Sequence, residues 1–292
     1  MTDDLIQISN GQLSVTVSAL GAEMQSLQDA AGRDYLWDGD AQYWTGRAPI
    51  LFPIVGRAPE DRIRVGDHSA DMGQHGFARR SRFTLIHADQ TACTHVLTPD
   101  EAIRAAYPRD FRLELTHSLD GTALSVTATV TNTGPAPLPF GLGFHPAFRW
   151  PLPGAAGQPH RVTLDGAAAP EMARLADGLL PPQRHPSPFE KGRLTLDQSL
   201  FDADAMLFPN AGIPGLTYGP DQGPQMKFTF ENLPDLALWS KPGAPFLCIE
   251  PWHGTAARTT DGPAIEDRPN TILLPSGQAR AFSYRVTLIP PA

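Results

Sequence analysis

The sequence has few of the features that mark disulfide-bonded or membrane proteins. It contains only two cysteines in 292 residues, Cys93 and Cys248, and neither belongs to a CxxC pair, so we expect reduced core thiols. It has no run of 18 apolar residues that could cross a membrane. The first ten residues, MTDDLIQISN, lack the basic and apolar regions of a signal peptide. These absences predict a cytoplasmic protein with no membrane partner.

Positive charge is scarce as well. The formal net charge is −8 and the isoelectric point is about 5.5. A nucleic-acid partner would require a basic face with stacking aromatic residues. We therefore expect no nucleic-acid partner.

The chain also lacks the short motifs of several common enzyme classes. It has no P-loop and no GxGxxG string for a nucleotide, and no GxSxG string for a serine hydrolase. Its nine histidines form neither HxH nor HExxH, the spacings that favour a cupin-like or zinc-hydrolase site. We therefore expect no cofactor and no metal.

Alternation of apolar and polar residues is what the sequence does contain, from end to end. This alternation predicts strands with one face on a core, because successive side chains of a strand point to opposite faces. The clearest examples are Leu13–Val17, Leu124–Val130, Met226–Phe230 and Phe282–Leu288. Asp120-Gly121 lies between segments 112–119 and 122–130, and it predicts a tight hairpin turn.

Helical patterns are few. The best is Thr98-Pro99-Asp100-Glu101, a capping-box sequence that could start a turn or two of helix before Pro108. No rhythm of alternating strands and helices is present. The sequence therefore predicts an all-β fold, a large antiparallel β-sandwich with long loops and few short helices.

Glycine and proline indicate how this fold is organised along the chain. The 26 glycines and 30 prolines are spread throughout, which indicates many turns rather than a linker. We expect a single domain over residues 1–292. Segment 151–195, which is weakly periodic, is predicted to be an excursion from the sandwich. We see no strong coiled-coil or edge-strand signal, and we expect a monomer or a weak homodimer.

Four segments depart from this pattern and carry candidate polar groups; they are 48–57, 74–79, 140–148 and 246–254. The first ends in Gly56-Arg57, where glycine permits a close approach and arginine offers a planar donor fork. A core strand with a surface arginine is the alternative, and the segment taken alone favours it. The second offers His75 and Arg79 beside a glycine, and a turn with a solvated histidine is the alternative.

The other two segments each place one titratable residue among apolar ones. His145 lies in FGLGFHPAF, which fits a sugar pocket, where aromatic rings pack on the C–H faces of a pyranose. It also fits a hydrogen-bonded core histidine. Glu250 follows four apolar residues and precedes Pro251 and Trp252. A buried carboxylate needs a partner or a raised pKa, so Glu250 is a candidate general base. A salt bridge across strands is the alternative.

Four strings occur in order along the chain: PILFPIVGR (49–57), HGFAR (75–79), GFHPAF (143–148) and CIEPWHG (248–254). Together they resemble the aldose 1-epimerase, or galactose mutarotase-like, superfamily, and most of all its bacterial branch of aldose epimerase-like proteins. The resemblance covers nearly the whole chain. It implies a large antiparallel supersandwich with an active site in a groove on one face. It also implies a cofactor-independent isomerase whose partner is a small-molecule sugar.

The resemblance implies roles for individual residues. The acid histidine of the family falls on His145 and its base glutamate on Glu250. This pair would interconvert the α and β anomers of a hexose, because it would open and reclose the ring. A second substrate histidine falls on His75, and the substrate arginine falls on Arg57.

The family also has an aspartate that binds sugar hydroxyls and precedes a short apolar run. Here that run is 205–208, which favours Asp204. Asp202, two residues upstream and on the same face of the predicted strand, is the alternative.

Two other functions fit the same residues. HGFAR also occurs in hexose-6-phosphate epimerases of the superfamily, in which arginines gather around the phosphate. Arg79 lies in that string, and Arg57, Arg80 and Lys241 could assist it, although a net charge of −8 gives no general attraction for an anion. The fold could also be a non-catalytic carbohydrate-binding module, which would need aromatic platforms but no acid–base pair.

Overall fold

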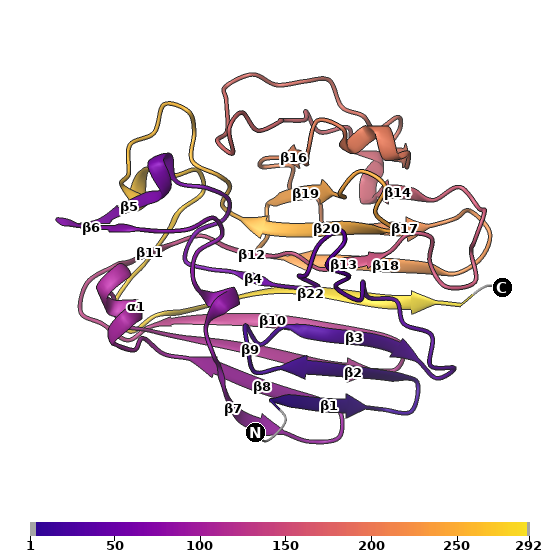
Figure 1. The fold of residues 1–292 in the computed structure, drawn as a ribbon, viewed down its shortest axis with the longest axis horizontal. Coiled ribbons are helices and arrows are strands. Elements are labelled where there is room, and N and C mark those ends of the chain that lie inside the picture. The colour runs from indigo at the N-terminus through magenta and orange to yellow at the C-terminus, as the bar shows by residue number, and fades with distance from the viewer. Residues whose placement is uncertain (1–3, 291–292) are drawn as a thin grey trace.

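The computed structural model describes residues 4–290, and its strands form antiparallel sheets joined by long loops (Figure 1). The largest sheet has nine strands. In spatial order they are β15 (Arg193–Thr195), β14 (Arg161–Leu164), β17 (Gly215–Gly219), β18 (Gln225–Glu231), β22 (Ala279–Ile289), β10 (Ala123–Asn132), β9 (Phe111–Asp120), β8 (Ala92–Leu97) and β7 (Thr84–Ala88). The central strand β22 is also the last in the sequence, and it pairs with β10 on one side and β18 on the other.

A second sheet carries the candidate site. Its strands are β16 (Met206–Phe208), β19 (Asp235–Trp239), β20 (Phe246–His253), β12 (Leu142–Phe144) and β4 (Ile50–Leu51), and β13 (Ala147–Arg149) also pairs with β20. The smaller sheets are β1 (Leu5–Ser9), β2 (Leu13–Ser18) and β3 (Met24–Asp29), then β5 (Arg62–Val65) with β6 (His68–Asp71), and β11 (Leu138–Phe140) with β21 (Ile272–Leu274).

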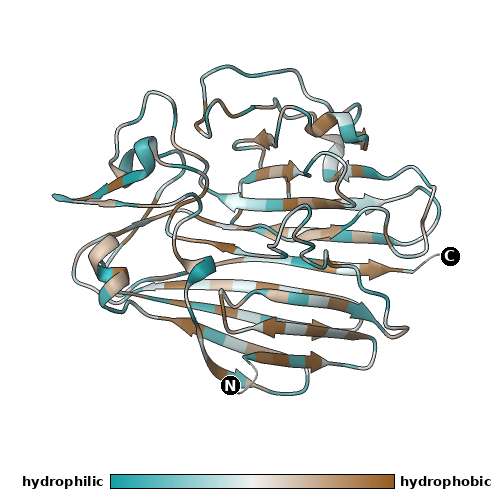
Figure 2. Ribbon diagram, in the orientation of Figure 1, coloured by the Kyte–Doolittle hydropathy of each residue, from teal (hydrophilic) through white to brown (hydrophobic). Residues whose placement is uncertain are grey.

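One hydrophobic core joins the three larger sheets. Val15 of β2, Ile249 of β20 and Val286 of β22 are fully buried members of it. Figure 2 shows hydrophobic and hydrophilic residues alternating along several of the strands. The structure therefore confirms the predicted all-β architecture, a set of antiparallel sheets held together by their apolar faces.

The predicted strands and hairpin are present. The alternating segments that begin at Leu13, Leu124, Met226 and Phe282 lie within β2, β10, β18 and β22. β9 and β10 form the hairpin, in which Asp120 pairs with Ala123. Gly121 in its turn has φ +56°, a conformation that glycine adopts without strain.

Helices are short, as predicted. They are α1 (Glu101–Ala106) and the 3-10 turns η1 (Pro59–Asp61), η2 (Ala78–Arg80), η3 (Asp165–Ala167), η4 (Gln198–Phe201) and η5 (Ile265–Asp267). The predicted cap of α1 was two residues too early. Asp100, not Thr98, is the N-cap, and its carboxylate accepts a hydrogen bond from the Ile103 backbone N–H. Among the residues described, no helix is both long and apolar enough to cross a membrane.

The predicted excursion over 151–195 is only partly correct. β14 and β15, at the two ends of this segment, belong to the nine-stranded sheet. Between them the chain forms η3 and isolated bridges, such as Ala173 with Leu207 of β16. The strands were missed because they are three or four residues long, too short for the alternation to stand out.

Candidate active site

A pocket of about 370 Å³ lies on the six-stranded sheet, on the face turned away from the main core. Its walls contain five of the predicted residues, three tryptophans and several small side chains. The lining residues are Trp44, Gly56, Gln74, His75, Arg79, His145, Leu175, Asp204, Ala205, Leu207, Trp239, Glu250, Trp252 and Ala256. The fold therefore brings together polar groups that are up to 175 residues apart, from His75 to Glu250.

Glu250 reaches the pocket because of the alternation along β20. Leu247 and Ile249 point into the main core, so Cys248, Glu250 and Trp252 point to the opposite face. Glu250 is 1% exposed, and its Oε2 atom is buried without a hydrogen-bond partner among the described residues. Burial raises the pKa of Glu250 well above its ordinary value, and the negative charge of Asp204 adds to this.

His145 follows β12, which pairs with β20, and it meets Glu250 across the floor of the pocket. Its Nε2 atom lies 3.1 Å from Glu250 Oε2, although the two groups are not aligned as a hydrogen bond. Its Nδ1 atom is buried and has no partner among the described residues. Burial lowers the pKa of His145 to about 3, and the charge of Arg79 contributes. The pair therefore favours a neutral imidazole beside a protonated carboxyl group.

Two tryptophans enclose the imidazole of His145. The Trp44 ring stacks on it at 4.9 Å between ring centroids with an interplanar angle of 31°. Trp239 of β19 meets the imidazole edge-on at 5.8 Å. These rings exclude water from the histidine and also offer apolar faces to a ligand.

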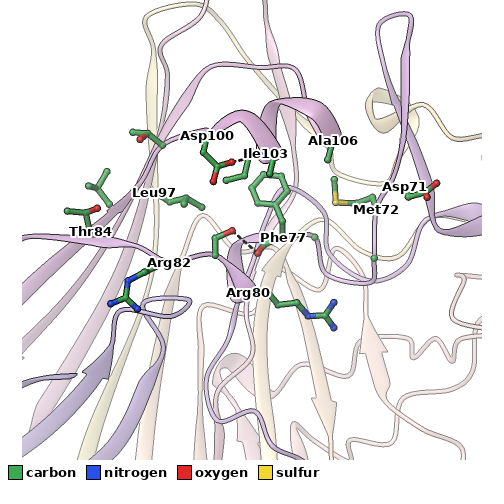
Figure 3. A pocket seen from close by; sticks show the side chains of 16 residues that line it. Asp71, Met72, Phe77, Arg80, Arg82, Thr84, Leu97, Asp100, Ile103 and Ala106 are labelled. Atoms are coloured by element: carbon green, nitrogen blue, oxygen red, sulfur yellow. Dashed lines mark hydrogen bonds between the residues drawn. The ribbon is translucent and has the colours of Figure 1, made fainter. Parts of the chain in front are cut away.

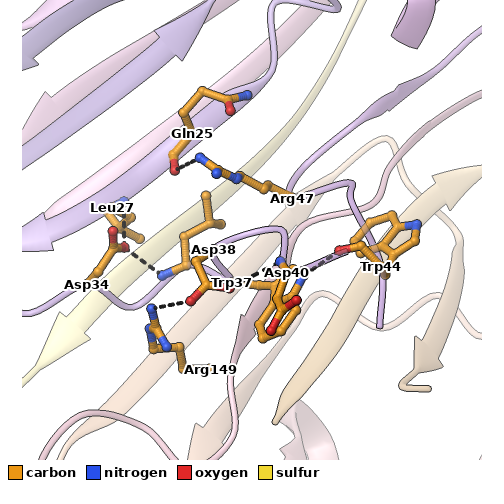
Figure 4. Close-up of polar contacts among 10 residues, drawn as sticks. Gln25, Leu27, Asp34, Trp37, Asp38, Asp40, Trp44, Arg47 and Arg149 are labelled. Atoms are coloured by element: carbon orange, nitrogen blue, oxygen red, sulfur yellow. Dashed lines mark hydrogen bonds and ion pairs between the residues drawn. The ribbon is translucent and has the colours of Figure 1, made fainter. Parts of the chain in front are cut away.

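Trp44 belongs to an irregular segment that polar contacts hold over the sheet (Figure 4). Trp37 Nε1 donates a hydrogen bond to the Trp44 carbonyl at 2.8 Å. Asp38 forms an ion pair with Arg149 of β13 at 3.2 Å. Arg47 donates to the carbonyl of Gln25 at 2.8 Å. The segment is therefore tied to β3 and β13, and these ties set the position of the Trp44 ring.

His75 is held in one tautomer. Its Nδ1 atom accepts a hydrogen bond from the backbone N–H of Gly56 at 3.0 Å, and its own backbone N–H donates to the Gly56 carbonyl. Burial, with the charges of His145 and other neighbours, lowers the pKa of His75 well below its ordinary value. The ring is therefore neutral, and its proton must lie on Nε2. His75 can donate a hydrogen bond but does not carry a charge.

Arg79 and Asp204 add the two ionic side chains of the walls. Arg79 donates to the carbonyl of Gln74 at 2.8 Å, and its Nε atom is buried without a partner among the described residues. Asp204 lines the pocket, whereas Asp202 is the C-cap of η4 and is not a lining residue. The expectation that both aspartates lie on one strand was wrong, because β16 begins only at Met206.

Arg57 is the predicted binding residue that the structure does not bring to the pocket. Its guanidinium forms two hydrogen bonds of 2.7 Å with the carboxylate of Asp61, and its side chain is 42% exposed. Gly56, the preceding residue, lines the pocket, but the side chain of Arg57 does not. It pairs with Asp61 instead.

The two further candidates for phosphate binding also lie elsewhere. Lys241 donates to the carbonyl of Tyr43 at 2.9 Å. Arg80 lines a separate cavity of about 610 Å³, together with Met72, Phe77 and Ile103 (Figure 3). Arg79 is therefore the one member of the predicted arginine and lysine cluster that lines the pocket.

Sequence reasoning missed the aromatic walls and one buried arginine. Trp252 was visible in CIEPWHG, but nothing in the strings containing Trp44 and Trp239 indicated that these rings meet at His145. Arg268 is 6% exposed and donates to the carbonyls of Val55 and Thr255 at 2.7 and 3.1 Å. It ties together two chain segments near the pocket, and only the folded structure reveals this contact.

Comparisons with known proteins agree with this geometry. A sequence profile described as aldose 1-epimerase matches residues 4–287. The chain is 31% identical over 297 aligned residues to the chromosomal protein LacX of Lactococcus lactis subsp. lactis, which covers 97% of this chain and 99% of that protein.

Two solved structures are also similar. A galactose mutarotase related enzyme from Lactobacillus acidophilus has a TM-score of 0.93 at 25% identity, over 99% of this chain and 98% of that one. A galactose mutarotase-like protein from Lactobacillus casei ATCC 334 has a TM-score of 0.87 at 28% identity, over 98% and 100%. The similarity extends over almost the full length of each pair.

Proposed function

This chain belongs to the aldose 1-epimerase family, and from this we propose that it is an isomerase that interconverts the α and β anomers of a free aldose. The observation that carries the proposal is the 3.1 Å separation of His145 Nε2 and Glu250 Oε2 in an aromatic pocket. The anomeric hydroxyl and the ring oxygen of a sugar are bonded to the same carbon. An acid and a base that serve these two oxygens must therefore both reach one small region of the pocket, as His145 and Glu250 do.

In the proposed mechanism, carboxylate Glu250 takes the proton of the anomeric hydroxyl while imidazolium His145 donates a proton to the ring oxygen. The bond between C1 and the ring oxygen breaks, which leaves an aldehyde and a free hydroxyl. After rotation about C1–C2, Glu250 returns its proton to the aldehyde oxygen and His145 takes one from the hydroxyl. The ring closes as the other anomer. Each positioned acid or base contributes about 10²–10⁴-fold in rate.

Each turnover uses two protonation states of one pair. Burial disfavours charge on both groups, and so it favours the neutral state that closes the ring. The ion-paired state that opens the ring forms when the proton passes from Glu250 to His145. The polar groups of a bound sugar stabilise this ion pair, because they surround it in place of water. Protons balance over the cycle, and no co-reactant is required.

The remaining pocket residues are proposed to orient the sugar. His75 donates through Nε2, Arg79 through Nε, which has no partner in the described part of the chain, and Asp204 accepts from hydroxyl groups. The faces of Trp44 and Trp239 pack on the C–H groups of the ring. These contacts hold the anomeric carbon against the acid–base pair, and such positioning lowers the entropic part of the barrier.

A hexose 6-phosphate is the second candidate substrate, and the position of Arg79 in the pocket favours it. A guanidinium binds phosphate well. Arg57, Arg80 and Lys241 have other contacts or line another cavity, which leaves one arginine for a dianion. We therefore place free aldoses first.

The test is anomer exchange measured by NMR on a panel of free aldoses and their 6-phosphates. We expect the wild-type protein to accelerate exchange of at least one free aldose, and Glu250→Gln to lower that rate by about 10²–10⁴-fold. Glu250→Gln keeps the shape of the side chain and removes the base, so circular dichroism should be unchanged.

Three outcomes separate the alternatives. Acceleration of the phosphorylated sugars alone would favour the hexose-6-phosphate epimerase. Line broadening without acceleration on any sugar would indicate a carbohydrate-binding module and contradict the isomerase. Equal rates for wild type and Glu250→Gln would exclude Glu250 as the base.

A further inference from the structure

Cys248 lies beside the proposed acid–base pair and has no part in the mechanism above. It is two residues before Glu250 on β20 and points to the same face of the sheet, where it is fully buried. Its Sγ atom, one ring nitrogen of His145 and one carboxylate oxygen of Glu250 all lie within 4.8 Å of one another. Among the residues that the structure describes, the buried Glu250 Oε2 atom, which faces His145 Nε2, has no hydrogen-bond partner.

This set of one sulfur, one nitrogen and one oxygen donor suits a specific class of ion. Zinc binds thiolate, imidazole and carboxylate at bond lengths of about 2.0–2.3 Å, usually with tetrahedral geometry. Donors around such an ion lie about 3.3–3.8 Å apart, so shifts of about 1 Å would be sufficient. Three protein donors leave one position of a tetrahedral ion free for a water molecule, and two of them, His145 and Glu250, line the pocket.

We propose that Cys248, His145 and Glu250 form an inhibitory site for Zn²⁺ or a similar divalent transition-metal ion. The ion replaces the thiol proton of Cys248 and the carboxyl proton of Glu250, and both protons leave to solvent. One thiolate and one carboxylate then balance its two positive charges, which leaves the buried site neutral. The inhibition rests on the proposed epimerase function, because the bound donors can no longer transfer protons to a sugar.

The three donors come from two separate strings, GFHPAF and CIEPWHG. A short motif such as HxH or HExxH therefore could not reveal this site. β12 and β13 flank His145 and both pair with β20, and these pairings bring the strings together. The proposed ion inhibits the acid–base pair and takes no part in the reaction. The site therefore agrees with an epimerase that needs no metal for catalysis.

The test uses purified full-length protein after chelator treatment, in the wild-type form and as Cys248→Ala and Cys93→Ala. Cys93 is the matched control, because it is also a buried free thiol but lies on β8. Cobalt(II) is added as the spectroscopic probe, and Zn²⁺ affinity is measured by competition with a chromophoric chelator. We expect one equivalent of cobalt to give a thiolate-to-metal charge-transfer band in the wild type and in Cys93→Ala.

Cys248→Ala should lose this band, and its Zn²⁺ affinity should fall by more than the roughly 10- to 100-fold that loss of a partner of a metal ligand typically costs. It should keep its anomer-exchange activity and lose sensitivity to Zn²⁺. A band that persists in Cys248→Ala, or that is absent from the wild type, would overturn the site. Equal Zn²⁺ affinity in all three proteins would show adventitious binding to surface histidines and would also overturn it.

If Cys248→Ala does not fold, X-ray absorption at the zinc edge of the wild-type protein can test whether a sulfur atom is among the zinc ligands. One sulfur among the ligands supports the site, and its absence excludes it. The cobalt and zinc measurements contain no sugar, so they do not depend on the proposed epimerase. A protein that binds the metal through Cys248 but accelerates no anomer exchange would contradict the function and leave the metal site intact.

Discussion

Arg57 and Arg79 show how much of a residue's role depends on its nearest partner. Each is the last residue of a glycine-containing string that resembles the family. Asp61 holds Arg57 outside the pocket, whereas Arg79 is half-buried in the pocket wall, and no group within residues 4–290 pairs with its Nε atom. The resemblance indicated both arginines, but a sequence string does not indicate that an aspartate four residues away will bind one of them.

This difference gives a paired prediction. Arg79→Ala should lower kcat/KM by roughly 10- to 100-fold, because a charged hydrogen bond contributes about 1.5–3 kcal/mol. Arg57→Ala should leave kcat/KM close to the wild-type value, because its side chain does not line the pocket and an exposed ion pair adds only about 0–1 kcal/mol to stability. Steady-state anomer-exchange kinetics of both variants would check this. A larger loss for Arg57→Ala would mean that Arg57 leaves Asp61 when sugar binds.

Trp44 gives a second prediction at the level of one side chain. Its ring stacks on His145 and offers its remaining surface to the pocket. Trp44→Ala should raise KM roughly 3- to 10-fold, because an aromatic contact contributes about 0.5–1.5 kcal/mol beyond its buried area. Trp44→Phe, which keeps a ring, should recover most of the loss. If both variants have wild-type KM, Trp44 does not contact the sugar.

Among the elements, the strands were the most predictable part of the fold. β2, β10, β18 and β22 each have one face on a core, and their alternation could be recognised in the sequence. β4 and β14–β16 have only two to four residues and have too few positions for a period. Segment 38–47, which carries Trp44, has no regular element at all. Isolated backbone hydrogen bonds, such as the one from the Ala147 N–H to the Arg47 carbonyl, and side-chain contacts define its position.

The close approach of β12 and β20 gives a prediction for a pair of elements. Gly143 of β12 pairs with Trp252 of β20, and a Cβ atom at Gly143 would lie 2.4 Å from Trp252 Cδ1. Gly143→Ala should therefore destabilise the protein by about 1–3 kcal/mol and displace Trp252 in the pocket wall. Gly262→Ala is the matched control, because a Cβ there has no heavy atom within 4 Å. Urea unfolding and anomer exchange measure both effects, and equal stability of the two variants would contradict this packing.

Considered as a whole, the molecule buries histidines far from the pocket as well. His95 of β8 and His117 of β9 are 1% and 2% exposed, and the Nδ1 atom of each is buried without a partner among the described residues. Burial lowers the pKa of both, that of His117 to about 3, and His95 contributes to the shift of His117. The folded state therefore resists their protonation, whereas the unfolded chain accepts protons at an ordinary pKa of about 6.5.

The sign of the pH dependence follows from this difference. These depressed pKa values do not reduce stability above about pH 6.5, but stability falls as the pH drops below that value, by up to about 1.4 kcal/mol per pH unit for each histidine that stays neutral in the folded state. Urea unfolding from pH 8 to pH 5 should show the decline. His117→Asn should flatten it, even if it lowers stability at pH 8. His87→Asn should not, because the side chain of His87 is 58% exposed. If the wild type and His117→Asn lost stability equally between pH 8 and pH 5, His117 would be excluded as a source of the pH dependence.

The central position of β22 has a consequence for how the protein is made. The ribosome synthesises β10 and β18 well before β22, the strand that pairs with both. Until residues 279–289 leave the exit tunnel, each of these two strands has a free edge, and such edges are templates for aggregation. A nascent chain in this state would benefit from a chaperone. A premature stop codon shortly before residue 279 would keep every residue of the proposed site in the chain. It would nevertheless remove β22, the strand that joins the two halves of the nine-stranded sheet.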